Sequence, residues 1–226
     1  MNMSRAGAPP GQRRRNRPVY LMLSLFLMVL IQPAMAGKPF ASLVMGVLVS
    51  LTVFSSALSV LRNRRLFVVI CCLGLPSIAL NWLSRSAHLG LATDVLSSVL
   101  MTAFGGTILT VMVANILTAS TVTANTLCRA VSGYILIGLT WAFAYETVVL
   151  LDPSSIASLS AGSSAGEFMY FSVITMTTLG FGDITPVSPY ARSLAMVQAI
   201  VGPMYLAILV ARLVAMYQHG LPGEQG

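Results

Sequence analysis

The sequence predicts an all-α membrane protein with six membrane-spanning helices and a short re-entrant helix that enters the membrane without crossing it. Of its 226 residues, 56% are hydrophobic and only 8% are charged, whereas an average soluble domain carries about 25% charged residues. The mean hydropathy is +0.84. So few charges do not cover a water-facing surface, which excludes a soluble enzyme. We expect no enzyme activity and expect lipid around most of the chain.

Each predicted spanning helix is an apolar stretch long enough for a hydrocarbon core ~30 Å thick, which takes about 20 residues at 1.5 Å each. In chain order these stretches are Pro18–Gly37, Pro39–Leu61, Leu66–Ser84, Val95–Ala119, Ala130–Leu151 and Ser193–Tyr217. Residues 1–36 have a second interpretation, because a basic start, an apolar run and Ala34-Met35-Ala36 are also typical of a cleaved secretory signal. We favour a retained first helix because it completes the six-helix pattern.

The basic residues predict the orientation of these helices. With the N-terminus in the cytoplasm, the inner side holds Arg5, Arg13, Arg14, Arg15, Arg17, Arg62, Arg64, Arg65, Arg129 and Arg212, and the outer side holds Lys38, Arg85 and Arg192. Cytoplasmic loops of membrane proteins carry such an excess of Lys and Arg. The net charge of +7 is therefore a topology signal and indicates no nucleic-acid partner. We expect a multi-pass protein of the cell membrane with both termini in the cytoplasm.

The segment between the last two spanning helices has a different pattern. Pro153–Gly166 is rich in Ser, Ala and Gly and predicts a surface loop. Ser164 and Glu167 match a capping box, which starts a helix. The apolar run Phe168–Thr178 that follows is too short to span the membrane, and Gly180 and Gly182 come directly after it. Non-helical backbone at membrane depth is tolerated where it is buried in protein or lines a water-filled cavity. Alternate glycines allow successive carbonyls to face one side, where they could bind a cation that has lost its water.

At these residues the chain resembles the potassium-channel pore family. The resemblance covers about residues 127–217 and includes the order of pore helix, filter, Asp183, Pro186 and the helix from Arg192. The sequence Thr178-Leu179-Gly180-Phe181-Gly182 is similar to the selectivity filter, with Leu for the usual Val and Phe for the usual Tyr. The resemblance implies passive, selective conduction of K⁺ through a ring of carbonyls from four copies of the chain, hence a homotetramer in membrane lipid.

The resemblance also implies a role for each matching residue. The K⁺ ligands would be the carbonyls of Thr178, Leu179, Gly180 and Phe181, with the Thr178 hydroxyl, and Gly182 would close the outer end. Support for the filter would come from Tyr170, Phe171, Asp183 and Glu146, with a hydrogen bond between Tyr170 and Asp183. For Glu146 an ordinary interfacial charge is an equal alternative. The inner-helix hinge and the pore lining that holds the gate would be Gly202, Pro203, Leu206, Val210 and Val214.

The same resemblance divides the chain into parts. Residues 1–17 and 218–226 are expected to be short cytoplasmic tails, with no room for a soluble regulatory domain. Residues 127–217 form the expected pore domain. Residues 18–126 form a four-helix peripheral domain in the position of a voltage sensor, but Val95–Ala119 contains no Arg or Lys. We therefore predict little voltage dependence from charge movement.

No cofactor is expected, and K⁺ enters only as the permeant ion. Cys71, Cys72 and Cys128 have no spacing that indicates a metal site or a disulfide framework. Two alternatives stay open: a less selective monovalent cation channel, and a non-conducting membrane scaffold or transporter subunit. An acidic residue at the position of Phe181 would favour the first, and four degenerate filter segments in one chain would favour a transporter. The sequence has neither feature.

Overall fold

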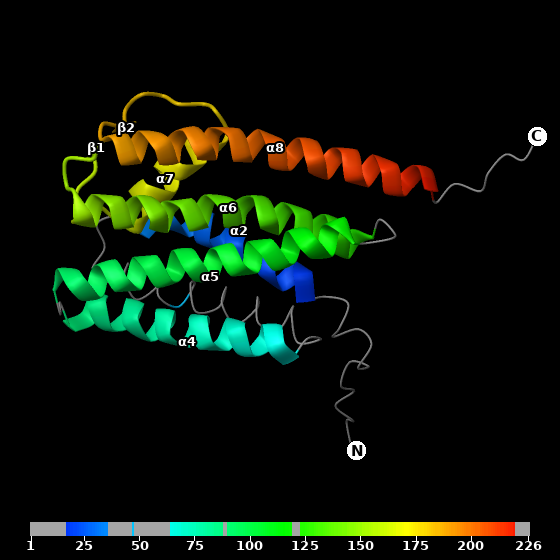
Figure 1. The fold of residues 1–226 in the computed structure, drawn as a ribbon, viewed down its shortest axis with the longest axis horizontal. Helices are drawn as coiled ribbons and strands as arrows, with labels where there is room; N and C mark the ends of the chain where they lie inside the picture. The colour runs from blue at the N-terminus through cyan, green and yellow to red at the C-terminus, as the bar shows by residue number, and fades with distance from the viewer. Residues whose placement is uncertain (1–16, 36–46, 48–63, 88–89, 119–122, 220–226) are drawn as a thin grey trace, which may run out of the picture.

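The computed structural model describes residues 17–35, 47, 64–87, 90–118 and 123–219 (Figure 1). Its helices and strands are α2 Arg17–Met35, α4 Arg64–Ala87, α5 Leu91–Leu117, α6 Ala124–Leu151, β1 Ile156–Ala157, α7 Ala165–Met176, β2 Thr185–Pro186 and α8 Pro189–His219. The predicted second spanning helix, Pro39–Leu61, lies outside the described residues, with the exception of Val47. The all-helical character of the prediction is confirmed, apart from one pair of two-residue strands.

Three helices within the described residues are long and apolar enough to cross a membrane. They are Leu91–Leu117, Thr126–Leu151 and Pro189–Ala215, and two shorter apolar helices are Met22–Ile31 and Val68–Leu83. The chain is thus a multi-pass membrane protein, and the number of six helices stays a prediction.

The helices of the structure extend beyond the charge-free stretches that predicted them. α5 begins at Leu91 and takes Asp94 into its first turn, where the helix dipole favours a negative charge. α6 begins at Ala124 because the Thr123 side chain accepts a hydrogen bond from the Thr126 N–H. Arg129 therefore lies inside α6. A charged residue near a helix end keeps its charge in water while the helix continues, so the charge-free criterion placed the starts of these helices too late.

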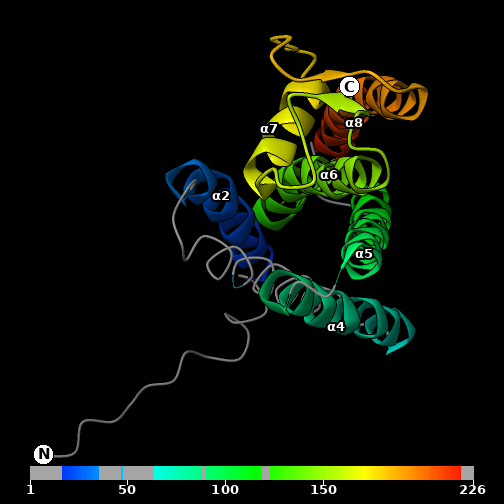
Figure 2. The ribbon, with the colours of Figure 1, turned by 90° about the vertical axis from the view of Figure 1, so that its left-hand side faces the viewer.

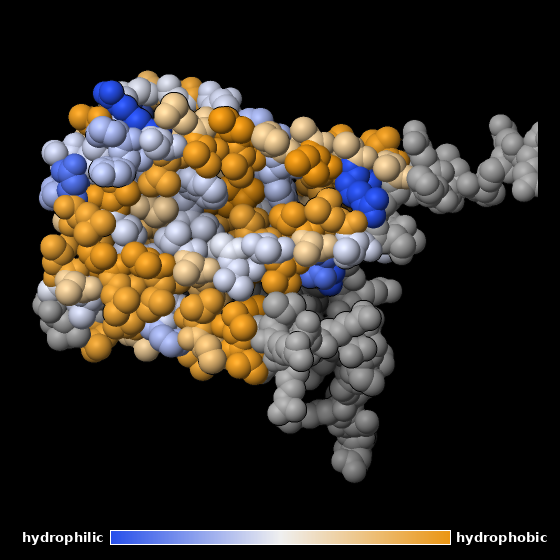
Figure 3. Space-filling model, in the orientation of Figure 1, coloured by the Kyte–Doolittle hydropathy of each residue, from blue (hydrophilic) through white to orange (hydrophobic). Residues whose placement is uncertain are grey.

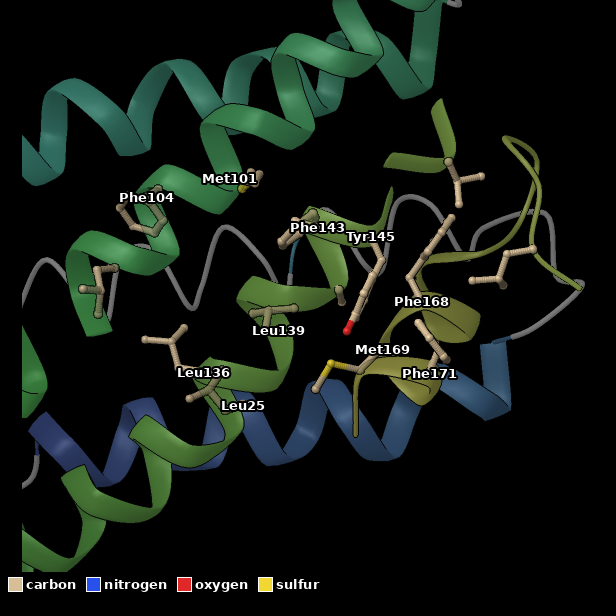
Figure 4. Close-up of a cluster of buried hydrophobic side chains, with 14 of the residues drawn as sticks. Leu25, Met101, Phe104, Leu136, Leu139, Phe143, Tyr145, Phe168, Met169 and Phe171 are labelled. Atoms are coloured by element: carbon tan, nitrogen blue, oxygen red, sulfur yellow. The ribbon is translucent and has the colours of Figure 1, made fainter. Parts of the chain in front are cut away.

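α6 lies at the centre of the arrangement. Seen end on, α2, α5, α7 and α8 surround it, and α4 packs on the far side of α5 (Figure 2). The buried cluster joins side chains of α2, α4, α5, α6, α7 and α8 into one core. Figure 4 shows Tyr145 of α6 among Phe168, Met169 and Phe171 of α7. The short helix α7 is therefore held by the same core as the long helices.

The surface has the distribution expected of a protein in lipid. Apolar residues cover the middle of the visible face, and strongly hydrophilic residues gather near its two ends (Figure 3). α7, β1 and β2 lie together at one of these ends (Figure 1). The short helix and its loops thus form one end of the bundle, with the following loop beside α8.

Candidate functional site

The start of α7 is fixed by the capping box that the sequence predicts. The Ser164 hydroxyl accepts a hydrogen bond from the Glu167 N–H, and the Ser164 N–H donates to Glu167 Oε2 over 2.6 Å. This pair satisfies two N–H groups that a helix start leaves without partners. α7 has 12 residues, or about 18 Å at 1.5 Å per residue. Its length confirms that it is too short to cross a membrane.

The end of α7 passes directly into the candidate filter. The Ile174 carbonyl accepts hydrogen bonds from the N–H groups of both Leu179 and Gly180, at 2.9 and 3.2 Å. The Thr178 N–H donates to the Thr175 carbonyl over 3.0 Å. After this turn the chain returns toward the end of the bundle at which β2 lies (Figure 1). The first residues of the candidate filter are therefore held in place by the last turn of α7.

The backbone of the candidate filter alternates in the sign of φ. Thr178, Gly180 and Gly182 have positive φ values of 58°, 51° and 82°. Leu179 and Phe181, which lie between them, do not. Alternation between left- and right-handed conformations turns successive N–H groups to one side of the chain, which leaves the carbonyls free to face the other. A positive φ costs a residue with a Cβ about 1–2 kcal/mol, so Thr178 is held in a strained conformation.

Two side chains of the candidate filter are largely exposed in one copy of the chain. Leu179 is 57% exposed and Phe181 is 67% exposed. Both are large and apolar, and they stand next to the carbonyls that would bind an ion. A single copy of the chain therefore leaves these two side chains mostly exposed.

The outer part of the candidate filter is tied to α7 by the predicted hydrogen bond. The Tyr170 hydroxyl donates to Asp183 Oδ2 over 2.7 Å. This hydrogen bond, together with desolvation and the charge of Asp183, raises the pKa of the Tyr170 phenol above its usual value. The phenol therefore keeps its proton through the neutral pH range.

The neighbouring Phe171 faces the opposite way. It is buried, and its ring meets the Tyr145 ring edge to face, with ring centroids 4.7 Å apart. Of the predicted aromatic pair, Tyr170 thus contacts the filter loop and Phe171 anchors α7 to α6. Glu146 is half-buried on α6, next to Tyr145. Its predicted role in support of the outer loop stays a prediction.

The loop after the candidate filter is also tied to the loop after α6. β1 and β2 pair antiparallel, with Ile156 opposite Pro186. The Ser155 carbonyl accepts hydrogen bonds from the N–H groups of Val187 and Ser188, at 2.8 and 3.0 Å. Sequence reasoning predicted only a surface loop here. Ile156, an isolated apolar residue in a polar stretch and 1% exposed, was the signal that could have indicated this anchor.

The predicted hinge and lining residues of α8 are in two different environments. Gly202 is buried, and a Cβ at this position would overlap the carbonyl oxygen of Met176 at the end of α7. Gly202 thus lets α8 approach the base of the candidate filter. The other predicted residues, Pro203, Leu206, Val210 and Val214, are exposed in the single chain. That these four line a pore stays a prediction.

Sequence reasoning missed three polar side chains behind α7. Tyr145, Ser172 and Gln198 come from α6, α7 and α8, and each is 0% exposed. They are linked by hydrogen bonds. Each stands in an apolar run that predicted only a spanning or re-entrant helix. A polar residue inside such a run is the signal that could have found them, because a polar group in a membrane helix needs a partner.

Comparison with known proteins points in the same direction as this geometry. Residues 122–219 match a family model described as "Ion channel". The chain is 30% identical to a voltage-gated potassium channel of Aeropyrum pernix over 83 residues, which are 37% of this chain and 26% of that relative. It is 38% identical to the potassium voltage-gated channel protein shk-1 of Caenorhabditis elegans over 50 residues, 22% of this chain and 9% of that relative. The chain thus spans a minor part of the length of either relative, and no solved structure matches it.

Proposed function

We propose that this chain, whose residues 122–219 match a family model described as "Ion channel", is the subunit of a potassium-selective channel. The observation that carries the proposal is the alternating φ of Thr178, Gly180 and Gly182 directly after a re-entrant helix. This backbone suits a row of carbonyls, which can replace the water around a K⁺ ion. The proposed ligands are the carbonyls of residues 178–181, with the Thr178 hydroxyl at the inner end. Rings of backbone carbonyls are the known basis of ion selectivity in potassium channels.

The proposed assembly is a homotetramer. One chain supplies one filter segment, and a closed ring of carbonyls needs several such segments around a common axis. The exposed side chains of Leu179 and Phe181 support this assembly, because neighbouring copies would cover them. In this assembly Leu206, Val210 and Val214 of α8 would line the inner pore and form its gate below Gly202.

The proposed orientation places α7 and the filter loop at the outer face of the membrane. Asp152, Glu167 and Asp183 lie in the loops and at the helix start of this end, and Arg212 lies near the other end of α8. Carboxylates near the outer mouth attract cations, which favours entry of K⁺ from that side. Both termini would then be cytoplasmic.

The test is uptake of ⁸⁶Rb⁺ into proteoliposomes that contain the purified chain, with Na⁺ as the competing ion. We expect uptake by the wild type that Na⁺ does not inhibit. Gly180→Ala should abolish selective uptake, because Gly180 has a φ of +51° that a residue with a Cβ rarely adopts. No atom lies within 4 Å of its added Cβ, so the effect is on the backbone.

Gly162→Ala is the matched control. Gly162 lies in the exposed loop before α7, has no positive φ, and its added Cβ would meet only Ser160 Oγ at 3.8 Å. We expect this variant to transport Rb⁺ as the wild type does. Absence of uptake by the wild type would favour the non-conducting scaffold, and equal uptake of Na⁺ would favour the less selective channel.

A further inference from the structure

The face of α8 that packs within the chain is narrow and contains one fully buried polar side chain. Over residues 189–215, where side chains of α8 are described, the buried residues are Ala191, Gln198 and Gly202. They recur at spacings of seven and four residues, so they share one face of the helix. Gln198 lies one turn before Gly202 and has 0% exposure. A primary amide so placed must have its hydrogen-bonding groups satisfied within the protein.

Gln198 and its partners form a continuous series of hydrogen bonds that joins three helices. The Tyr145 hydroxyl of α6 donates to Gln198 Oε1 over 2.7 Å. Gln198 Nε2 donates to the Ser172 hydroxyl of α7 over 2.7 Å. The Ser172 hydroxyl donates to the Gly138 carbonyl of α6 over 2.6 Å. This series of hydrogen bonds begins and ends on α6 and passes through α8 and α7, so it fixes the positions of the three helices relative to one another.

We propose that Gln198 is a positioning residue that sets the geometry of the selectivity filter through Ser172. This inference rests on the proposed function, since it assigns a further residue to the same site. Gln198 is one turn of α8 from Gly202, and Ser172 is one turn of α7 from Met176, the residue that Gly202 contacts. α8 therefore holds α7 at two successive turns, once by hydrogen bonds and once by direct backbone approach.

A displacement of α7 would also move the filter, because few residues separate the two. Ile174 follows Ser172 by two residues, and its carbonyl holds the N–H groups of Leu179 and Gly180. A shift of α7 moves this carbonyl and with it the start of the filter strand. Apolar packing alone permits such a shift more readily, because hydrogen bonds are directional and apolar contacts are not. The buried amide thus couples the position of α8 to the spacing of the filter carbonyls.

The test is the ratio of Rb⁺ to Na⁺ uptake in proteoliposomes for the wild type, Gln198→Met, Ser172→Ala and the double variant. Met has a volume close to that of Gln and makes neither hydrogen bond. Each single variant removes two buried hydrogen bonds, and we expect each to lower the ratio about tenfold. The double variant should fall no further than the lower single one, because both substitutions remove the same link.

The matched control is Tyr205→Phe. The Tyr205 hydroxyl also ties α8 to α6, by a hydrogen bond of 2.8 Å to the Ala130 carbonyl, but this bond does not reach α7. We expect its ion ratio to equal that of the wild type even if the stability of the protein falls. Tyr145→Phe leaves the link between Gln198 and Ser172 in place, and its ratio should lie between those of Gln198→Met and the wild type.

Three results would overturn the inference while the proposed function stands. They are a wild-type ratio in Gln198→Met, an equal fall of the ratio in Tyr205→Phe, and additive falls in the double variant. If Gln198→Met does not assemble, Ser172→Ala and Tyr145→Phe each remove a single hydroxyl and give the same comparison with Tyr205→Phe. A wild type without selective uptake would instead refute the proposed function, and this inference would fall with it.

Discussion

α6 and α8 both pack on α7, and they are similar in length and hydropathy, but they are buried to very different extents. Of the apolar window of α6, 56% is buried inside the chain, against 11% for α8. α6 packs on α2, α5, α7 and α8, whereas α8 packs on α6, α7 and β2. Two helices of similar hydropathy are therefore enclosed to different extents by the described residues: α6 is largely buried within its own chain, and most of α8 is exposed.

The two helices also differ in the kind of contact that they make with their neighbours. α5 and α6 lie close enough that a Cβ on Gly105 would overlap Thr140 Oγ1, and Thr147 Oγ1 donates to Ser98 Oγ over 3.0 Å. α8 contacts α6 and α7 along one narrow face, through hydrogen bonds of Trp141 Nε1 to the Leu194 carbonyl, of Tyr205 to the Ala130 carbonyl, and of Gln198 with Tyr145 and Ser172. α6 is thus enclosed on several sides, whereas α8 is joined to the rest of the described residues along one face.

The largest expected effect concerns the exposed face of α8. Val210→Cys and Val214→Cys, in a chain whose three native cysteines are replaced by serine, should lose nearly all current when a charged thiol reagent is applied from the inside. The reason is that a bulky charged group would then obstruct the proposed inner pore.

Ile208→Cys is the control for this experiment. Ile208 is 52% exposed, but at 100° per residue it faces about 160° away from Val210. We expect modified Ile208→Cys to conduct normally. Equal block at all three positions, or at none, would show that the exposed face of α8 has been assigned wrongly.

The next effect compares the substitution of Val by Ala on α6 and on α8. Val149 of α6 is 0% exposed and Val210 of α8 is 57% exposed. Val149→Ala should lower the free energy of unfolding by about 2–3 kcal/mol, through lost packing and the cavity left behind. Val210→Ala should change it by less than about 0.5 kcal/mol. Thermal unfolding of the purified protein in detergent measures both, and equal losses would contradict the difference in burial.

A third effect compares how closely neighbouring atoms approach three glycines. Gly202→Ala brings a Cβ onto a backbone oxygen, Gly105→Ala brings one onto the end of the Thr140 side chain, and Gly106→Ala meets nothing within 4 Å. We expect Gly202→Ala to cost about 1–3 kcal/mol of stability because backbone must shift. Gly105→Ala should cost less, and Gly106→Ala should be neutral or stabilising by up to about 1 kcal/mol. The order of the three melting temperatures checks this, and loss of the order would show that α8 is not held closely to α7.

The smallest expected effect is voltage dependence. A charge that crosses the whole membrane field contributes about 2.3 kcal/mol per 100 mV, and the only charged residue of α5 is Asp94, in its first turn. α5 is also packed along α6. We expect the conductance of the channel in planar bilayers to change little with voltage. A steep activation curve would mean that charge moves elsewhere in the chain.

Local signals predicted much of the site correctly. The capping box of Ser164 and Glu167, the short helix after it and the hydrogen bond of Tyr170 to Asp183 are all present. Each depends on residues close together in the sequence, or on a motif that is recognised by the order of its residues. The anchor between Ser155 and the loop after the candidate filter was not predicted, since its partners are far apart in the sequence. The partners of Gln198 were missed for the same reason.

That residues 178–182 form a filter stays a prediction from the family resemblance. By itself, the sequence determined that the chain lies in a membrane and roughly where the long helices that the structure describes run. These features follow from composition and local order, because lipid demands apolar helices with internally paired backbones. Only the tertiary structure decided which of two equally apolar helices is enclosed, and which buried amide meets which hydroxyl. Tyr145 and Gln198, like Trp141 and Leu194, are 53 residues apart. Only the packing of α6, α7 and α8 brings such pairs together.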